Sequence, residues 1–166
     1  MTEISVIAER VGTVHNVPIQ LGMDYFDAKF DTGSSATVIA ASVFFEGWSE
    51  KAINMLETLC SQKGCKLKEF KSASGHRIKG YPVIARDVSI GEIVFPIFRY
   101  YLIIDGRHEM SLLGDDFIDN CRYSHEPHGD IKITAFDFDN YGGDQEGALD
   151  NNELLSLIDG LIEESL

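Results

Sequence analysis

A single acidic residue in a tight turn, Asp31, is the strongest candidate for chemistry in this sequence. It lies within the segment A-K-F-D-T-G-S-S-A-T-V-I. Apolar and polar residues alternate before it with the period of a half-buried strand, so Asp31 comes at a strand's end. Gly33 permits a sharp turn, and the hydroxyls of Thr32, Ser34 and Ser35 can hold a carboxylate through short-range hydrogen bonds. The pattern favours a positioned acid, although D-T-G-S alone also suits an ordinary polar turn.

Three segments of the chain resemble parts of one known family. The Asp31 segment resembles the active-site loop of aspartic proteases. The segment S-L-L-G-D-D-F-I, Ser111–Ile118, resembles the apolar-apolar-glycine stretch that closes the core behind that loop. Between them, F-K-S-A-S-G-H-R-I-K-G, Phe70–Gly80, resembles a flap hairpin. Their order and separation resemble those of the retroviral type, the retropepsins, and the resemblance covers residues 6–138.

The resemblance implies a fold class and a division of the chain. We expect an all-β, retropepsin-like acid protease fold: a closed β-barrel with one half-site per subunit, an inserted helix and a C-terminal helix. The retropepsin-like aspartic protease domain is expected over residues 1–138. An acidic, glycine-rich linker is expected over 139–149, and an amphipathic helix over 150–166.

Local patterns predict strands as far as Phe138, interrupted by one helix. Ser49 can cap the start of that helix and Gly64 can end it. The final predicted hairpin turns through E-P-H-G, a sequence rich in turn formers. The predicted strands are Ile4–Ala8, His15–Leu21, Tyr25–Phe30, Thr37–Ala40, Tyr81–Ile90, Val94–Ile104, Cys121–His125 and Asp130–Phe136.

A second helical pattern ends the chain. Asp150 can cap it, Glu153 completes a capping box, and apolar residues recur along one face. Two interpretations remain open: the helix packs on its own domain, or it docks a partner or a second subunit.

Composition limits the classes of partner. The hydrophobic fraction is 44% with 25% charged residues, which is typical of a globular chain. A net charge of −13 argues against nucleic acid and anionic membrane surfaces as partners. The first twenty residues lack the apolar core of a signal peptide, so a cytoplasmic protein is expected. Cys60, Cys65 and Cys121 cannot all pair within one chain, which fits a reducing compartment.

We expect no metal and no cofactor. Cys60 and Cys65 have no histidine near them in the sequence, and His125 and His128 lie on either side of a predicted turn. A calcium-loop pattern that begins at Asp137 fails, because its twelfth position lacks the glutamate that such a loop needs.

Peptide hydrolysis without a metal or a covalent nucleophile needs two carboxyl groups that share one proton. The chain has a single D-T-G, so the hypothesis requires a homodimer with Asp31 from each subunit on the two-fold axis. By resemblance, Thr32 braces the opposite subunit's loop, Gly33 bonds the substrate backbone, and Ser34 donates to the outer oxygen of Asp31. Such a donor favours the ionised form, so we expect an acidic to mildly acidic pH optimum.

The resemblance also implies residues that bind substrate. Ser74, Gly75 and His76 belong to the expected flap tip, which could close over an extended peptide. The expected core-loop contacts are Ser35, Leu113 and Gly114. Viral enzymes carry an ion pair whose two positions correspond to Ser35 and Asp115 here, so both charges of that pair are missing.

The sequence therefore predicts an aspartic endopeptidase. It would hydrolyse peptide bonds of an extended polypeptide with water activated between the two Asp31 carboxylates of a homodimer. The alternative is a catalytically inactive module of the same fold that binds a peptide or dimerises through the same groove.

Overall fold

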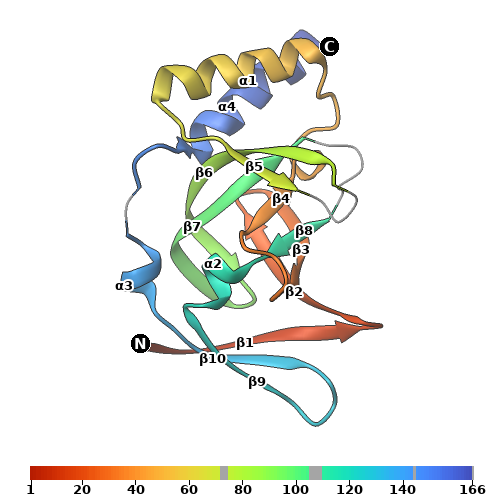
Figure 1. Cartoon of the computed structure of the whole chain (residues 1–166), viewed down its shortest axis with the longest axis vertical. Helices are drawn as coiled ribbons and strands as arrows, with labels where there is room; N and C mark the ends of the chain where they lie inside the picture. The colour runs from red at the N-terminus through yellow and green to blue at the C-terminus, as the bar shows by residue number, and fades with distance from the viewer. Residues whose placement is uncertain (72–74, 105–109, 144, 166) are drawn as a thin grey trace.

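The computed structural model describes residues 1–71, 75–104, 110–143 and 145–165. Strands dominate it, and helices cover one end (Figure 1). The strands are β1 (Thr2–Val11), β2 (Val14–Leu21), β3 (Asp24–Phe30), β4 (Val38–Ala40), β5 (Lys68–Lys71), β6 (Arg77–Ile90), β7 (Ile93–Ile103), β8 (Ser111–Leu113), β9 (Cys121–His125), β10 (Ile131–Phe136) and β11 (Leu149–Asp150). The α-helices are α1 (Glu50–Lys63), α2 (Asp115–Ile118), α3 (Phe138–Tyr141) and α4 (Asn151–Glu164), and a 3-10 turn, η1, covers Ala41–Val43.

Six strands close into a barrel. The order β6-β7-β4-β8-β3-β2 returns to its start because β2 also pairs with β6, through Ile19 with Ile90 and Gln20 with Ser89. Closure removes the open edges that a flat sheet would expose. The expected all-β closed barrel with an inserted helix and a C-terminal helix is confirmed.

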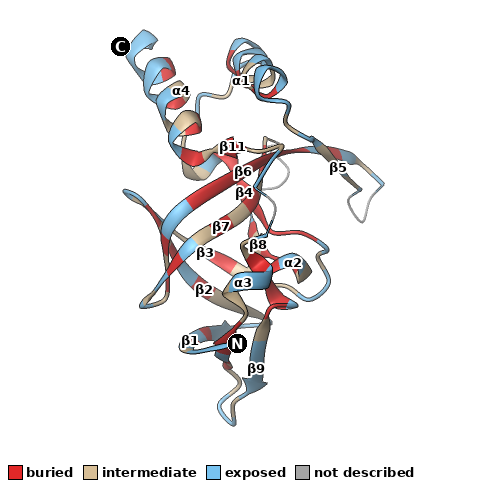
Figure 2. Ribbon diagram, turned by 90° about the vertical axis from the view of Figure 1, so that its left-hand side faces the viewer, coloured by how far each residue is buried: buried red, intermediate tan, exposed pale blue. Residues whose placement is uncertain are grey.

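An aromatic core fills the barrel and the space beneath α2. Phe95, Phe98, Phe117 and Phe136 are each fully buried, and their rings lie within contact of one another. Inward-facing residues alternate with exposed ones along β2 and β3, as the sequence pattern predicts. Figure 2 shows the buried residues concentrated on the barrel strands and the exposed residues on β9 and the outer faces of the helices.

A three-stranded layer lies at the end of the barrel opposite α1 and α4 (Figure 1). Strand β1 pairs with β10, and β10 pairs with β9. The predicted final hairpin is therefore present. The Gly129 amide donates to the Glu126 carbonyl (3.0 Å) within its turn.

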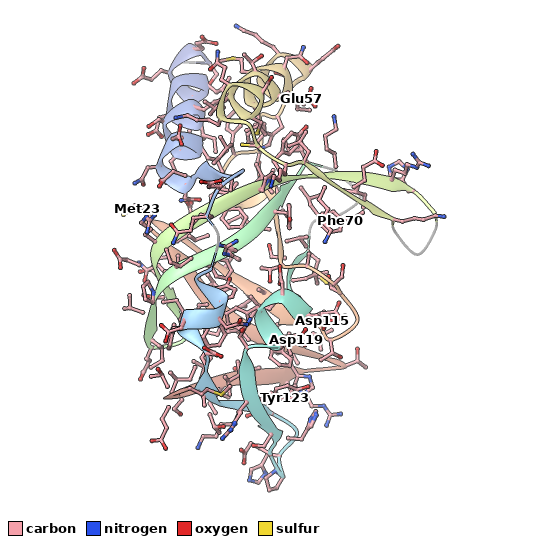
Figure 3. All side chains as sticks on the ribbon, turned by 60° about the vertical axis from the view of Figure 1, so that its left-hand side comes forward. Met23, Glu57, Phe70, Asp115, Asp119 and Tyr123 are labelled. Atoms are coloured by element: carbon pink, nitrogen blue, oxygen red, sulfur yellow. The ribbon has the colours of Figure 1, made fainter. Side chains whose placement is uncertain are left out.

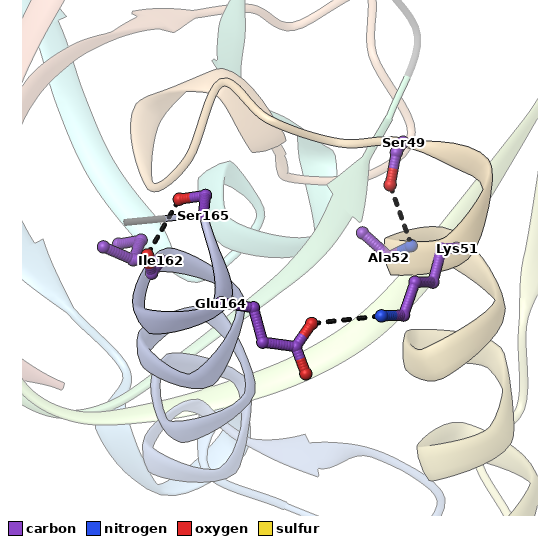
Figure 4. Close-up of polar contacts among 6 residues, drawn as sticks. All are labelled: Ser49, Lys51, Ala52, Ile162, Glu164 and Ser165. Carbon is purple, nitrogen blue, oxygen red and sulfur yellow. Dashed lines mark hydrogen bonds and ion pairs between the residues drawn. The ribbon is translucent and has the colours of Figure 1, made fainter.

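Helix α1 begins and ends where the sequence predicts. The Ser49 hydroxyl accepts a hydrogen bond from the Ala52 amide (3.2 Å), as Figure 4 shows. Gly64 takes the left-handed conformation, with a φ of 67°. A residue with a side chain would be strained in this conformation. Leu56 and Cys60 turn inward and join the main core.

Helix α4 packs on its own chain. Asp150 and Glu153 form the predicted capping box, and Leu154 and Ile158 belong to the main core. The Tyr100 hydroxyl also bonds to the buried side chain of Asn151.

Two contacts fix the ends of this C-terminal part of the chain. The segment before α4 forms β11, which runs parallel to β6 and pairs Leu149 with Val83. At the other end of α4, Glu164 pairs with Lys51 of α1 at 3.2 Å (Figure 4). Of the two interpretations of the C-terminal helix, the structure shows the one in which it packs on its own domain.

No helix in the described part of the chain is both long and apolar enough to span a bilayer. The described helices instead cover one end of the barrel or lie beside it (Figure 1).

Packing of α4 into the core predicts a position-dependent loss of stability. Leu154→Ala should lower the free energy of unfolding by about 2–5 kcal/mol, because its side chain is fully buried. Ile162→Ala on the same helix should cost less than about 1 kcal/mol, because Ile162 is 40% exposed. Urea unfolding of both variants measures the difference. Equal losses would contradict the packing of α4 into the core.

Candidate active site

Asp31 lies immediately after β3, in a turn that its own carboxylate helps to hold. The Gly33 amide donates to Asp31 Oδ1 (2.9 Å), and the Ser34 amide donates to the Asp31 carbonyl (3.2 Å). Thr32, Gly33 and Ser35 are exposed, while Asp31 and Ser34 are half-buried. The turn therefore presents one carboxylate at the surface of the chain in a fixed orientation.

The segment from Leu113 to Asp115 clamps this turn from behind. The Asp31 amide donates to the Leu113 carbonyl (2.9 Å), and the Asp115 amide donates to the Ser34 carbonyl (2.7 Å). Between them, Gly114 lies so close to Ala36 that a Cβ at 114 would be 2.3 Å from the Ala36 carbonyl oxygen. Only glycine permits that approach. The parallel pairing of β3 with β8 brings the two segments together.

Thr37 and Asp116 form a second link between the same two segments. The Thr37 amide donates to Asp116 Oδ1 (2.9 Å) and Oδ2 (3.0 Å), and the Thr37 hydroxyl donates to Oδ1 (2.6 Å). The Thr37 hydroxyl also accepts from the Gly114 amide (3.2 Å). Asp116 as a whole is solvent-exposed, but both oxygens of its carboxylate accept hydrogen bonds from Thr37. Loss of water around the carboxyl raises the pKa of Asp116, more than the hydrogen bonds lower it.

Lys29 brings a cation to the candidate acid. It lies two residues before Asp31 on β3, so both side chains project from the same face of the strand. Lys29 Nζ lies 3.8 Å from Asp31 Oδ2, and the two side chains are 32% and 25% exposed. Asp31 therefore has the Gly33 amide on one oxygen and an ammonium group near the other.

A β-hairpin overhangs the Asp31 turn. Strands β5 and β6 pair antiparallel, with Phe70 opposite Ile78 and Lys68 opposite Gly80. Phe70 lies beneath the hairpin, on the side that faces Asp115 of α2 (Figure 3). A Cβ on Gly80 would lie 2.5 Å from the Phe70 ring, so the missing side chain makes room for that ring.

A pocket lies between the hairpin and the Asp31 turn, with a volume of about 610 Å³. That volume is within the range of ligand sites in proteins. Its apolar wall includes members of a small buried cluster that is separate from the main core: Val38, Ile78 and Ile103, with Phe70 and Leu112 packed against them. Tyr101 packs against the same cluster, and burial raises the pKa of its hydroxyl.

Some of the expected site residues lie together at this pocket. Asp31, Gly33, Ser34 and Ser35 line it. The flap-tip residue Ser74 lies outside the described residues. Gly75, at a φ of 81°, and His76 directly precede β6.

The expected hydrogen bond of Ser34 differs from the geometry of the single chain. The Ser34 hydroxyl donates to the Ala36 carbonyl (2.8 Å), not to Asp31, because the turn places that acceptor within its reach. The side chain of Leu113 is fully buried in the core. In the single chain, the backbone of Leu113 supports the site through its carbonyl, and the substrate contacts expected of Leu113 and Gly114 stay a prediction.

Sequence reasoning did not identify Lys29, Thr37 or Asp116 as residues of this site. A signal for Lys29 was present, because a spacing of two on a strand places it beside Asp31. Thr37 and Asp116 are 79 positions apart, and no local pattern links them. Within residues 1–71, 75–104, 110–143 and 145–165, no group of three or more His, Cys, Asp or Glu side chains is arranged to hold a metal.

The Thr37 to Asp116 link predicts a stability effect at one specific carboxylate. Asp116→Ala should lower the free energy of unfolding by about 1–3 kcal/mol, because the buried Thr37 loses the acceptor of both its donors. Asp116→Asn keeps one acceptor oxygen and should cost less. Asp119→Ala, an exposed carboxylate at the end of α2, is the matched control and should change stability by less than about 0.5 kcal/mol. Thermal and urea unfolding measure these losses. Equal losses of stability for Asp116→Ala and Asp119→Ala would refute the link.

Comparison with solved structures finds 186 matching chains. One of them is a retropepsin-like aspartic protease from Rickettsia conorii, with a TM-score of 0.49 and 17% sequence identity over 80% of this chain and 90% of that chain. No protein-family model matches the chain, and no curated protein matches it. The roles of Asp31 and its neighbours therefore rest on the geometry of the site itself.

Proposed function

We propose that this chain is one subunit of a homodimeric aspartic endopeptidase. The observation that carries the proposal is the position of the Asp31 carboxylate. It is held by the Gly33 amide, supported from behind by the Leu113 carbonyl, and opens into a pocket beneath a β-hairpin.

A second copy supplies what one chain lacks. Peptide hydrolysis by carboxylates needs a pair that shares a proton, and the sequence contains one D-T-G. In the single chain, Thr32, Gly33 and Ser35 are exposed beside Asp31. A two-fold axis through this turn would bring two Asp31 carboxylates together and cover these residues.

The proposed reaction uses both carboxyl groups of the pair. The ionised carboxylate takes a proton from a water molecule, whose oxygen attacks the peptide carbonyl carbon. The protonated carboxyl donates its proton to the carbonyl oxygen, which gives a tetrahedral intermediate. When this intermediate collapses, the carbon–nitrogen bond breaks, the leaving amine takes the proton of the carboxyl group, and a hydroxyl of the intermediate returns its proton to the pair as the new carboxyl product forms. The pair therefore again shares one proton.

The hairpin supports a polypeptide as the substrate class. The residues of β5 and β6 overhang the pocket, where an extended peptide could lie between the hairpin and the Asp31 turn. The pocket wall combines apolar and charged side chains, which suits a chain of mixed residues better than a small polar metabolite.

Replacement of Asp31 tests the function directly. Asp31→Asn should reduce the turnover of a peptide library by at least about 1000-fold, because the pair can no longer activate water. Asp159→Asn removes the same charge from an exposed position on α4 and should retain wild-type turnover. Turnover by Asp31→Asn equal to that of wild type would refute the proposal that the chain is an aspartic endopeptidase. Peptide binding without any turnover by wild type would favour the inactive binding module.

The shared proton predicts a bell-shaped pH profile. Activity should fall at low pH, where both carboxyl groups are protonated, and at high pH, where both are ionised. We expect the maximum in the acidic to mildly acidic range, measured as kcat/KM for one cleaved peptide. A maximum well above neutrality would argue against a carboxyl pair as the catalyst.

A further inference from the structure

The pocket above Asp31 is cationic in a chain that is strongly acidic overall. The chain has 14 Lys and Arg residues against 27 Asp and Glu residues. Three lysines nevertheless line this one pocket, Lys29, Lys68 and Lys71, beside the two acidic residues Asp31 and Glu69. Glu69 pairs with Arg77 across the hairpin at 3.8 Å. The local excess of positive charge points to a negatively charged group on the substrate.

Lys29 lies closest to the reacting centre. Its ammonium is 3.8 Å from Asp31 Oδ2, at the long limit of an ion pair, and its side chain is 32% exposed. A pair at this distance leaves the ammonium free to donate hydrogen bonds to a further acceptor, because Lys carries three donors. A substrate carboxylate that reaches Lys29 must therefore belong to a residue next to the bond being cut.

Lys68 extends the cationic wall onto the hairpin. Its ammonium lies 5.2 Å from the centre of the Phe70 ring and 5.6 Å from that of Tyr101. Contact with ring faces holds an ammonium in place without neutralising it. Among the residues that the structure describes, no carboxylate forms an ion pair with Lys68.

We propose that this pocket selects an acidic side chain, glutamate foremost, beside the scissile peptide bond. The inference rests on the proposed function and deepens it by naming a substrate class. A glutamate suits the pocket in two ways. Its carboxylate can accept from Lys29, while its methylene groups can pack on the apolar wall that contains Val38 and Leu112. Because two-fold symmetry places one Lys29 on each side of the paired Asp31 residues, either side of the bond can carry the acid.

Matched peptides measure this preference. The peptides differ only in glutamate, glutamine, leucine or lysine at each of the two residues that flank the bond. At about pH 5.5 a free glutamate is ionised. Wild type should then show roughly tenfold higher kcat/KM for glutamate than for glutamine, the effect of one charge-assisted hydrogen bond. Equal rates, or faster cleavage of the lysine peptide, would overturn the inference.

Lysine variants identify the residue responsible. Lys29→Met should bring the ratio of glutamate to glutamine cleavage to within about twofold of unity, because the partner of the carboxylate is lost. Lys68→Met should reduce the same ratio in part. Lys51→Met removes an exposed lysine of α1 that does not line the pocket, and should leave the ratio unchanged.

The same ratio separates substrate selection from an indirect effect on Asp31. If Lys29 acted only on the charge of Asp31, Lys29→Met would slow all peptides by the same factor and shift the pH profile. The glutamate to glutamine ratio would then stay at its wild-type value, and the inference would be wrong.

A binding measurement makes the inference independent of turnover. Calorimetry with Asp31→Asn protein should show tighter binding of the glutamate peptide than of the glutamine peptide, and the difference should disappear in the Asp31→Asn, Lys29→Met double variant. If wild type cleaved nothing and this difference persisted, the proposed function would fail while the acidic preference stood. Cleavage by wild type without any glutamate preference would retain the function and overturn the preference.

Discussion

The close approach of two backbone segments, at Gly114 and Ala36, is the constraint on which the site depends. No side chain fits between them, because a Cβ at 114 would meet backbone atoms of Ala36 at 2.3–2.8 Å. This contact lets the Leu113 carbonyl accept from the Asp31 amide and lets the Asp115 amide donate to the Ser34 carbonyl. The turn that carries the carboxylate is thus held by backbone hydrogen bonds from the residues on both sides of Gly114.

The strands of the barrel bring the two segments of that contact together. Strands β3, β8 and β4 pair side by side within the closed barrel and bring the two segments together. Helices α1 and α4 lie at the end of the barrel opposite β1, β9 and β10, and α4 contributes Leu154 and Ile158 to the main core (Figure 1). The hairpin of β5 and β6 extends from the barrel and leaves the pocket open beneath it. The support of Asp31 is therefore built from barrel strands, whereas the outer wall of the pocket is built on the hairpin.

Features with local causes were predictable from the sequence, and features that depend on distant pairing were not. Helix α1 begins after Ser49 and ends before Gly64, as predicted, because a cap acts within one turn of its helix. The strand before Asp31 and the glycine turn after it follow from local patterns as well. The bond from Thr37 to Asp116 and the parallel pairing of β11 with β6 arise only when segments far apart in the chain meet. Ser34 shows the same limit, because its hydroxyl was expected to donate to Asp31 and in the folded turn donates to the Ala36 carbonyl.

Mixing of subunits tests most directly the claim that Asp31 is half of a site. Wild-type and Asp31→Asn chains would be unfolded together, refolded at a constant total concentration, and assayed for peptide cleavage over a range of ratios. Since only dimers with two intact Asp31 residues would be active, an equal mixture should retain about one quarter of the wild-type activity. Retention of about one half, in proportion to the wild-type fraction, would show that each chain acts alone and would contradict the account.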